Sequence, residues 1–244
     1  MQPRKASLTA LGVAGAPAPD RLTTTFLLSG GIAVDSGALA HALPMEERRL
    51  VTDLLLTHAH LDHTLGVPFL LANQTLHIWG LAETLRVVRE NLLDGRIWPD
   101  LSTYAVWKPV TPGRSFRVGP YEVEAGLMTH TTDCVGYAFT SDSVSCVVTG
   151  DTRLEEEVLA WVAERRPAVC VVECSMPDER AEQARRYGHQ TPRDLPAWRR
   201  ALGNETRLLV THLKPDLETA VRQQCEALQD PSLALLRDGD VVDL

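Results

Sequence analysis

The pattern of apolar and polar residues changes along the chain. Up to residue 149 it shows short apolar runs bounded by glycine, proline or threonine, which is typical of strands. From residue 154 onward, segments with helical spacing alternate with short buried runs. Strands that first form hairpins and later alternate with helices predict two sheets packed face to face, with helices outside. We therefore expect an α/β fold, an αββα sandwich of two mixed β-sheets that forms a single domain over residues 1–244.

The boundaries of the expected elements follow from this pattern. Gly30-Gly31 and Gly119-Pro120 indicate tight turns between neighbouring strands. The expected strands are Ser7–Val13, Thr23–Ser29, Ile32–Asp35, Val51–Thr57, Ser115–Val118, Tyr121–Leu127, Val135–Thr140, Ser145–Thr149, Ala168–Cys174 and Leu208–Thr211, with Val241–Leu244 closing an edge. The expected helices are Leu65–Leu71, Leu81–Leu93, Leu154–Arg165, Asp178–Tyr187, Pro192–Leu202 and Leu217–Leu228.

Composition narrows the class of protein. The 244 residues are 44% hydrophobic, enough to bury a sizeable core. No apolar run reaches the roughly 18 residues that a membrane helix needs, so we expect no membrane contact. The formal charge of −8, without a basic block, argues against a broad nucleic-acid surface. The negative charge does not exclude an anionic small-molecule substrate, because bound metal ions would dominate the local field.

The cysteines and the N-terminus bear on where the protein works. The five cysteines are irregularly spaced and form no Cys-x-x-Cys pair, which fits reduced thiols in the cytoplasm. The basic residues 1–5 and the mildly apolar segment 8–18 carry a weak signature of a secretory signal, which would instead place the protein in the periplasm. Because this apolar segment is short and broken by Gly12 and Gly15, we expect a first strand and a tight loop there.

One heptapeptide concentrates the side chains that bind metals. Residues 57–63 read THAHLDH, so the metal-binding candidates fall within six positions: His58, His60, Asp62 and His63. Imidazole and carboxylate groups bind borderline transition metals such as zinc. One ion cannot easily use all of them from so short a run, whereas two neighbouring ions can. The motif follows a buried apolar run, and ligands gather at strand ends in open α/β sheets.

Further ligand-type side chains follow at long intervals, each after an expected strand or before an expected helix. They are His130, Asp151, His189 and His212. Taken alone, each is more often an ordinary loop residue or a helix cap. A functional role for them is favoured because the first motif needs further ligands from elsewhere in the chain.

Together these motifs resemble the metallo-β-lactamase superfamily and, within it, the class II cyclic-nucleotide phosphodiesterases. The resemblance runs from about residue 8 to near the C-terminus. It rests on HAHLDH at 58–63, IWPDL at 97–101, VECSMP at 172–177, GHQTP at 188–192 and HLKP at 212–215. The chain departs from the family after the metal motif. There, residues 64–68 read TLGVP where an aliphatic residue and then a Ser-Pro or Ser-Ala pair are usual.

The resemblance implies the αββα fold and a set of ligands divided between two divalent ions. The first ion would be held by His58, His60 and His130, the second by Asp62, His63 and His212, and both by a bridging Asp151. Such a set leaves room for a bridging water, which two ions about 3.5–4 Å apart can ionise at neutral pH. Zn²⁺ fits the histidine-rich set, although Mn²⁺ or Fe²⁺ could serve.

Five residues have candidate roles around this site, four of them with a plainer alternative. His189 could contact phosphate or protonate the leaving oxygen, or it could simply neighbour a helix cap. Thr191 could bind a phosphate oxygen or act as an N-cap. Asp62 could shuttle a proton in addition to binding metal. Glu173 would support the site from behind or be buried and paired, and Lys214 could reach a phosphate or be solvated.

The expected activity is hydrolysis of a 3′,5′-cyclic nucleotide, cAMP or cGMP, to the nucleoside 5′-monophosphate. One alternative is another hydrolase of this fold, acting on a lactone, thioester, sulfate ester or RNA 3′ end. Another is a nucleotide-binding protein without hydrolysis. Trp98, Tyr104 and Trp107 could stack a purine, although packing of a long loop is the commoner use of such residues. A homodimer is compatible with the sequence.

Overall fold

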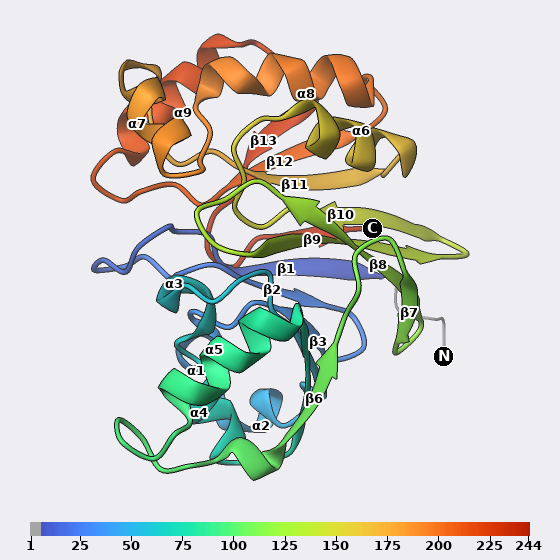
Figure 1. Cartoon of the computed structure of the whole chain (residues 1–244). Helices are drawn as coiled ribbons and strands as arrows, with labels where there is room; N and C mark the ends of the chain where they lie inside the picture. The colour runs from blue at the N-terminus through green and yellow to red at the C-terminus, as the bar shows by residue number, and fades with distance from the viewer. Residues whose placement is uncertain (1–5) are drawn as a thin grey trace.

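The chain folds into four layers, with two sheets face to face in the middle and helices on both outer faces (Figure 1). The computed structural model describes residues 6–244. This arrangement confirms the αββα sandwich of two mixed sheets. The basic segment 1–5, considered as part of a secretory signal, lies outside the described residues. Within residues 6–244, no helix combines the length and the apolar character needed to cross a membrane.

The first sheet joins the N-terminal strands to the last strand of the chain. Its order is β14-β1-β2-β3-β4-β5-β6, antiparallel from β14 to β3 and parallel from β3 to β6. The hairpin predicted at Gly30-Gly31 joins β2 to β3, and β14 closes an edge as expected. The bounds are β1 (Ser7–Gly12), β2 (Thr25–Leu28), β3 (Ile32–Val34), β4 (Asp53–Leu55), β5 (Leu76–Gly80), β6 (Ala105–Pro109) and β14 (Val241–Asp243).

The second sheet contains the remaining strands. Its order is β13-β12-β11-β10-β9-β8-β7, antiparallel from β7 to β10 and parallel from β10 to β13. The change from hairpins to parallel pairs occurs where the sequence pattern changes from strands to alternating strands and helices. The bounds are β7 (Ser115–Val118), β8 (Tyr121–Met128), β9 (Cys134–Ser141), β10 (Val144–Val148), β11 (Val169–Glu173), β12 (Arg207–Thr211) and β13 (Leu233–Leu235).

Helices α1–α5 lie outside the first sheet and α6–α9 outside the second, at the bottom and top of Figure 1. The first group is α1 (Leu39–Ala42), α2 (Met45–Arg48), α3 (Leu61–Thr64), α4 (Val67–Leu71) and α5 (Ala82–Leu92). The second group is α6 (Glu156–Glu164), α7 (Ala181–Arg186), α8 (Leu195–Leu202) and α9 (Glu218–Ala227). Three 3-10 turns complete the structure: η1 (Ser102–Tyr104), η2 (Asp178–Arg180) and η3 (Pro192–Asp194).

Three layers of apolar side chains fill the spaces between the sheets and helices. Neighbouring residues of one strand face different layers: Leu55 packs between the two sheets, while Leu54 packs against the helices outside the first sheet. On the other side, Val210 packs with Trp198 of α8 in the layer outside the second sheet. Because both faces of each sheet are covered, the central strands read as continuous apolar runs.

The elements that the sequence analysis missed are short. Strands β5, β6 and β13 have three to five residues, and α1 and α2 have four each. Over so few residues a strand and a single helical turn show no distinguishable period. The expected helix Leu65–Leu71 is shorter in the structure, where α4 begins at Val67 after Gly66, and the separate short helix α3 precedes it.

Candidate metal centre

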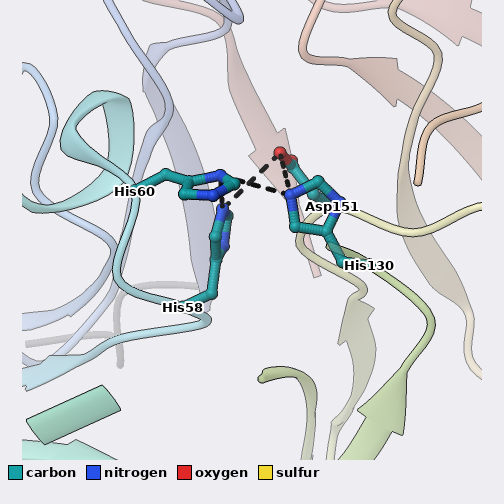
Figure 2. A group of neighbouring side chains, drawn as sticks. All are labelled: His58, His60, His130 and Asp151. Atoms are coloured by element: carbon teal, nitrogen blue, oxygen red, sulfur yellow. Dashed lines mark hydrogen bonds and ion pairs between the residues drawn. The ribbon is translucent and has the colours of Figure 1, made fainter. Parts of the chain in front are cut away.

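The first group of converging side chains joins both sheets. His58 and His60 follow β4, His130 follows β8 and Asp151 follows β10. Figure 2 shows their ring nitrogens and the carboxylate turned toward one another. His60 Nδ1 lies 3.0 Å from His58 Nε2 and 3.2 Å from His130 Nε2. The Asp151 Oδ2 atom lies 3.7 Å from His58 Nε2 and 3.9 Å from His130 Nε2.

A second group adjoins the first and shares Asp151. His63 Nε2 and His212 Nε2 are 3.4 Å apart, and Asp62 Oδ2 lies 3.2 Å from His212 Nε2 and 3.7 Å from His63 Nε2. The same Asp151 Oδ2 lies 3.2 Å from His212 Nε2 and 3.5 Å from His63 Nε2. The structure therefore brings all the predicted ligands together, in the two predicted sets, with Asp151 between them.

The residues present fit two divalent cations. Two imidazole nitrogens that each carry a lone pair repel one another at hydrogen-bond distance, and a cation between them removes that repulsion. Asp151 is 2% exposed and its Oδ1 atom has no hydrogen-bond partner. A buried acceptor without a partner costs about 1–3 kcal/mol, more when it is charged. Two neighbouring cations would remove the repulsion between these nitrogens and would neutralise the buried carboxylate of Asp151, and nitrogen and oxygen donors suit zinc and similar ions.

The charges of the cluster also favour cation binding. Burial lowers the pKa of His58 well below its ordinary value, and it lowers those of His60 and His130, which leaves these nitrogens unprotonated. Burial opposes ionisation of Asp151, but the neighbouring His212 and His63 hold its pKa well below the usual range. Burial likewise opposes protonation of His63, yet Asp151 and Asp35 raise its pKa well above the ordinary value. A bound cation would take the place of that proton.

Outer hydrogen bonds fix which ring nitrogen each histidine turns inward. The Nδ1 of His130 donates to the carbonyl of Gly188 (3.0 Å), so its Nε2 keeps a free lone pair. The Nδ1 atoms of three other ligands also have outer partners: His58 with Thr57 Oγ1 (3.0 Å), His63 with Asp35 Oδ2 (2.7 Å) and His212 with Ser175 Oγ (2.8 Å). The sequence analysis identified the candidate ligands but did not identify Asp35, Thr57 and Ser175 as their hydrogen-bond partners. Asp, Thr and Ser at strand ends also occur in ordinary turns, so only their position after β3, β4 and β11 could have pointed to them.

Two glycines let the backbone approach the histidines closely. A Cβ atom at Gly15 would lie 2.8 Å from Cε1 of His212, and one at Gly188 would lie 2.7 Å from Nδ1 of His130. Gly188 also has a positive φ of 72°. Both loops therefore depend on glycine, and the Gly12–Gly15 segment predicted as a tight loop packs directly against a ligand.

His189 faces the same cavity without belonging to either predicted ligand set. Its ring lies 5.0 Å from the ring of His130 and 5.3 Å from that of His212. Its Nδ1 is 4.0 Å from Asp151 Oδ2, but this nitrogen donates to Glu173 Oε1 at 2.9 Å and is not free to bind a metal. Burial opposes protonation, yet the charge of Glu173 raises the pKa of His189. Glu173 itself is fully buried behind the site, as expected.

Thr191 does not reach the cavity. It is fully buried and forms a reciprocal cap with Asp194 at the start of η3, with its backbone N–H donating to Asp194 Oδ2 at 2.9 Å and its Oγ1 3.3 Å from the same oxygen. This geometry is that of an N-cap. The alternative considered for Thr191, binding of a phosphate oxygen, is not supported by its position, because its hydroxyl is engaged inside the protein.

The cluster forms one wall of a cavity of about 610 Å³. Much of the remaining lining is apolar and includes Ala16, Pro17, Leu61, Leu65, Met176 and Tyr187. Lys214 also lines the cavity, and its Nζ donates to the carbonyl of Gly15 at 3.0 Å. A ligand in this cavity would therefore meet both the candidate metal-binding side chains and apolar side chains.

The aromatic residues considered for purine stacking lie elsewhere. Trp98 contacts the ring of Phe69 with centroids 5.1 Å apart, and Trp107 lies in β6 against the core outside the first sheet. Tyr104 is half exposed in η1. None of the three lines the cavity, so packing, the commoner use of such residues, accounts for Trp98 and Trp107.

Removal of divalent ions should lower the stability of the protein. A cation that binds only the folded chain raises the free energy of unfolding by about 2.7 kcal/mol at a hundred times its Kd. For a domain of this size that corresponds to a change of about 5–10 °C in Tm. Differential scanning fluorimetry of chelator-treated protein, before and after addition of Zn²⁺ or Mn²⁺, measures the shift. A Tm that no divalent ion changes would contradict the metal centre.

The sequence resembles known proteins over most of its length. Residues 30–213 match the model of the Beta-lactamase superfamily domain. The chain is 30% identical to 3′,5′-cyclic-nucleotide phosphodiesterase 1 of Saccharomyces cerevisiae over 179 residues, 58% of this chain and 48% of that protein. It is 32% identical to Ribonuclease J of Mycobacterium tuberculosis over 105 residues, 42% of this chain and 18% of that protein. The matched region thus spans about half, or less, of the length of these relatives.

Solved structures share the fold across the whole chain. The metallo-beta-lactamase fold protein YhfI from Bacillus subtilis superposes with a TM-score of 0.80 at 19% identity, covering 98% of this chain and 99% of that one. Unliganded yeast PDE1 gives 0.79 at 20% identity, with coverage of 98% and 99%. Human tRNase Z, short form, gives 0.73 at 19% identity, with coverage of 97% and 98%.

Proposed function

The chain belongs to the metallo-β-lactamase superfamily of metal-dependent hydrolases, and on that premise we propose that it is a dinuclear phosphodiesterase that opens a 3′,5′-cyclic nucleotide to the nucleoside 5′-monophosphate. The observation that carries the proposal is the convergence of two ligand sets on Asp151, beside a cavity into which the separate His189 also faces. The likeness to the yeast cyclic-nucleotide phosphodiesterase supports the substrate class.

The wall of the cavity formed by the candidate metal ligands suits attack on phosphorus. Two bound divalent ions would ionise a water and neutralise charge on the phosphoryl group during in-line displacement. Asp62 is the ligand best placed to handle the proton of that water, because its side chain is 20% exposed, whereas that of Asp151 is 2% exposed. Burial opposes ionisation of Asp62, but the neighbouring His212 and His63 hold its pKa low, so the carboxylate accepts rather than donates.

His189 suits the departure of the leaving oxygen. Glu173 accepts a hydrogen bond from Nδ1–H of His189, and this bond holds the ring so that Nε2 can carry the second proton. The charge of Glu173 raises the pKa of His189 although burial opposes this, which increases the protonated fraction of the ring at a given pH, and a general acid needs the protonated form. A proton delivered to O3′ would complete cleavage of the cyclic phosphate.

The cavity suits a nucleoside. Its volume of about 610 Å³ lies within the range of about 300–1,000 Å³ typical of small-molecule sites. With phosphate bound at the candidate metal ligands, apolar lining residues such as Leu65 and Tyr187 would be available to contact the base. An RNA phosphodiester is the second candidate, because the chain also resembles Ribonuclease J. The charge of −8 weighs against it, since RNA binding depends on basic phosphate contacts.

A substrate panel tests the proposal. Metal-replete protein should hydrolyse cAMP, cGMP or both, and bis-p-nitrophenyl phosphate more slowly, while a set of lactones, thioesters and sulfate esters stays intact. Chromatography of the products should give the 5′-monophosphate rather than the 3′-monophosphate. Turnover of a structured RNA in place of the cyclic nucleotides would favour the second candidate. Tight nucleotide binding by metal-replete protein with no turnover would identify a binding protein instead.

A further inference from the structure

We propose that Asp35 and Glu173 are a matched pair of positioning carboxylates that divide the histidines of the site between them. Asp35 follows β3 in the first sheet, and Glu173 ends β11 in the second. Asp35 would orient one ligand of each ion, and Glu173 would orient one ligand of the second ion together with His189. The part concerning metal ligands stands on the geometry alone, whereas the part concerning His189 as an acid rests on the proposed function.

Asp35 is 1% exposed and accepts every hydrogen bond that its carboxylate makes. Its Oδ1 accepts the backbone N–H of Thr57 at 2.8 Å. Its Oδ2 accepts the Thr57 hydroxyl at 2.8 Å and the Nδ1–H of His63 at 2.7 Å. Because the hydroxyl hydrogen of Thr57 is used in this bond, Thr57 Oγ1 can only accept from His58 Nδ1, 3.0 Å away. One carboxylate therefore sets the tautomer of His63 directly and of His58 through Thr57.

Glu173 repeats this pattern on the opposite side of the site. It is fully buried, and its Oε1 accepts from His189 Nδ1 at 2.9 Å and from the backbone of Thr152 at 3.3 Å. Its Oε2 accepts the Ser175 hydroxyl at 3.0 Å. The Ser175 oxygen then accepts from His212 Nδ1 at 2.8 Å. Here too a carboxylate holds one histidine directly and a second through a hydroxyl.

The backbone supports this assignment at Asp35. Its φ of 58° lies in the left-handed region that side-chain-bearing residues adopt rarely. His212, the ligand that Ser175 holds, has a φ of 62°. Left-handed residues persist where the surrounding structure holds them, and they cluster at functional sites. The same strained geometry thus occurs at one positioning carboxylate and at one ligand, both at the ends of strands that lead into the site.

The two carboxylates differ in what depends on them. His58 belongs to the first predicted ligand set and His63 to the second, so loss of Asp35 should weaken both ions. His212 belongs to the second set and His189 to neither, so loss of Glu173 should weaken the second ion alone. Groups that orient metal-bound histidines commonly contribute about 10–100-fold to metal affinity or activity.

The Asp35→Asn variant tests the first half. Asparagine keeps the shape and tolerates the left-handed backbone, but its NH₂ group would face the hydroxyl of Thr57 and the Nδ1–H of His63. We expect the affinities of both ions to fall about 10–100-fold, measured by competition of Zn²⁺ or Co²⁺ with a chromophoric chelator. The ¹⁵N shifts of the two imidazoles should show that the Nδ1–H tautomer is lost. Asp53→Asn is the matched control, because Asp53 is also held by a threonine and lies beside a histidine, His77, outside the site.

Four further variants separate the two halves. Glu173→Gln should weaken the second ion and leave the affinity of the first within about threefold, a margin well below the effect expected of an orienting partner. Thr57→Val should weaken only the first ion, while Thr57→Ser, which keeps the hydroxyl, should retain wild-type affinity. Ser175→Ala should weaken only the second ion. Circular dichroism of each variant checks that the fold is retained, and the two threonine variants remain informative if Asp35→Asn does not fold.

The pattern of site-specific losses decides the proposal. Equal loss of both ions in Glu173→Gln, unchanged affinity in Asp35→Asn, or equal behaviour of Thr57→Val and Thr57→Ser would each overturn it. None of these measurements uses a substrate. If cyclic nucleotides are not hydrolysed but the affinities divide as expected, the proposed function fails and the assignment of the carboxylates stands.

Discussion

Replacement of Asp151 by alanine should remove bound metal and reduce turnover by about 10³-fold or more. Metal ions contribute several kcal/mol of transition-state stabilisation, and each 1.36 kcal/mol corresponds to about a tenfold change in rate. Among residues 6–244, Asp151 has the carboxylate that lies between both ligand sets, with Oδ2 at 3.7 Å from His58 Nε2 and 3.2 Å from His212 Nε2. Its loss therefore withdraws charge from both ions at once.

The measurement pairs metal analysis with turnover. Elemental analysis of desalted Asp151→Ala should give well under the wild-type metal content, and circular dichroism should show the fold largely retained. Asp151→Asn keeps the shape and one oxygen but not the charge, so it should lose most of the metal as well. Asp53→Asn changes the same functional group outside the site and should keep both metal and turnover. Stoichiometric metal in Asp151→Ala, with wild-type activity, would refute the dinuclear site.

Replacement of His189 by alanine should leave both metals in place and reduce hydrolysis of the cyclic nucleotide by about 10²–10⁴-fold, the usual contribution of a general acid. The structure separates His189 from the ligands because its Nδ1 is engaged by Glu173 at 2.9 Å. Loss of the ring therefore removes a proton donor without removing a ligand. The expected signature is a fall in kcat at unchanged metal content.

A substrate with a better leaving group sharpens this test. p-Nitrophenolate departs without protonation, so hydrolysis of bis-p-nitrophenyl phosphate should suffer much less in His189→Ala than hydrolysis of cAMP. His77→Ala is the matched control, since His77 Nδ1 also lies beside a carboxylate, 3.2 Å from Asp53 Oδ1, but outside the cavity. Equal losses on both substrates would argue for a positioning role of His189, and full activity on cAMP would remove it from the mechanism.

The sequence by itself determined the fold class and the candidate ligands. Continuous apolar runs and helical spacing located most strands and helices, because burial on both faces of a sheet leaves that pattern in the sequence. The heptapeptide 57–63 predicted a two-ion site because few other roles require so many imidazoles and carboxylates in one short segment. Once it was recognised, His130, Asp151 and His212 followed from the family resemblance.

Only the tertiary structure decided how these ligands are oriented and which neighbours act with them. Asp35 lies 22 residues before Thr57, and Ser175 lies 37 residues before His212. A hydrogen bond between such distant residues leaves no periodic trace, and the same residue types are common in turns. Thr191, a plausible phosphate contact in the sequence, became a helix cap because Asp194 lies within reach of its backbone and hydroxyl. Residue type thus specified the metal chemistry, while the convergence of strand ends from the two sheets specified its geometry.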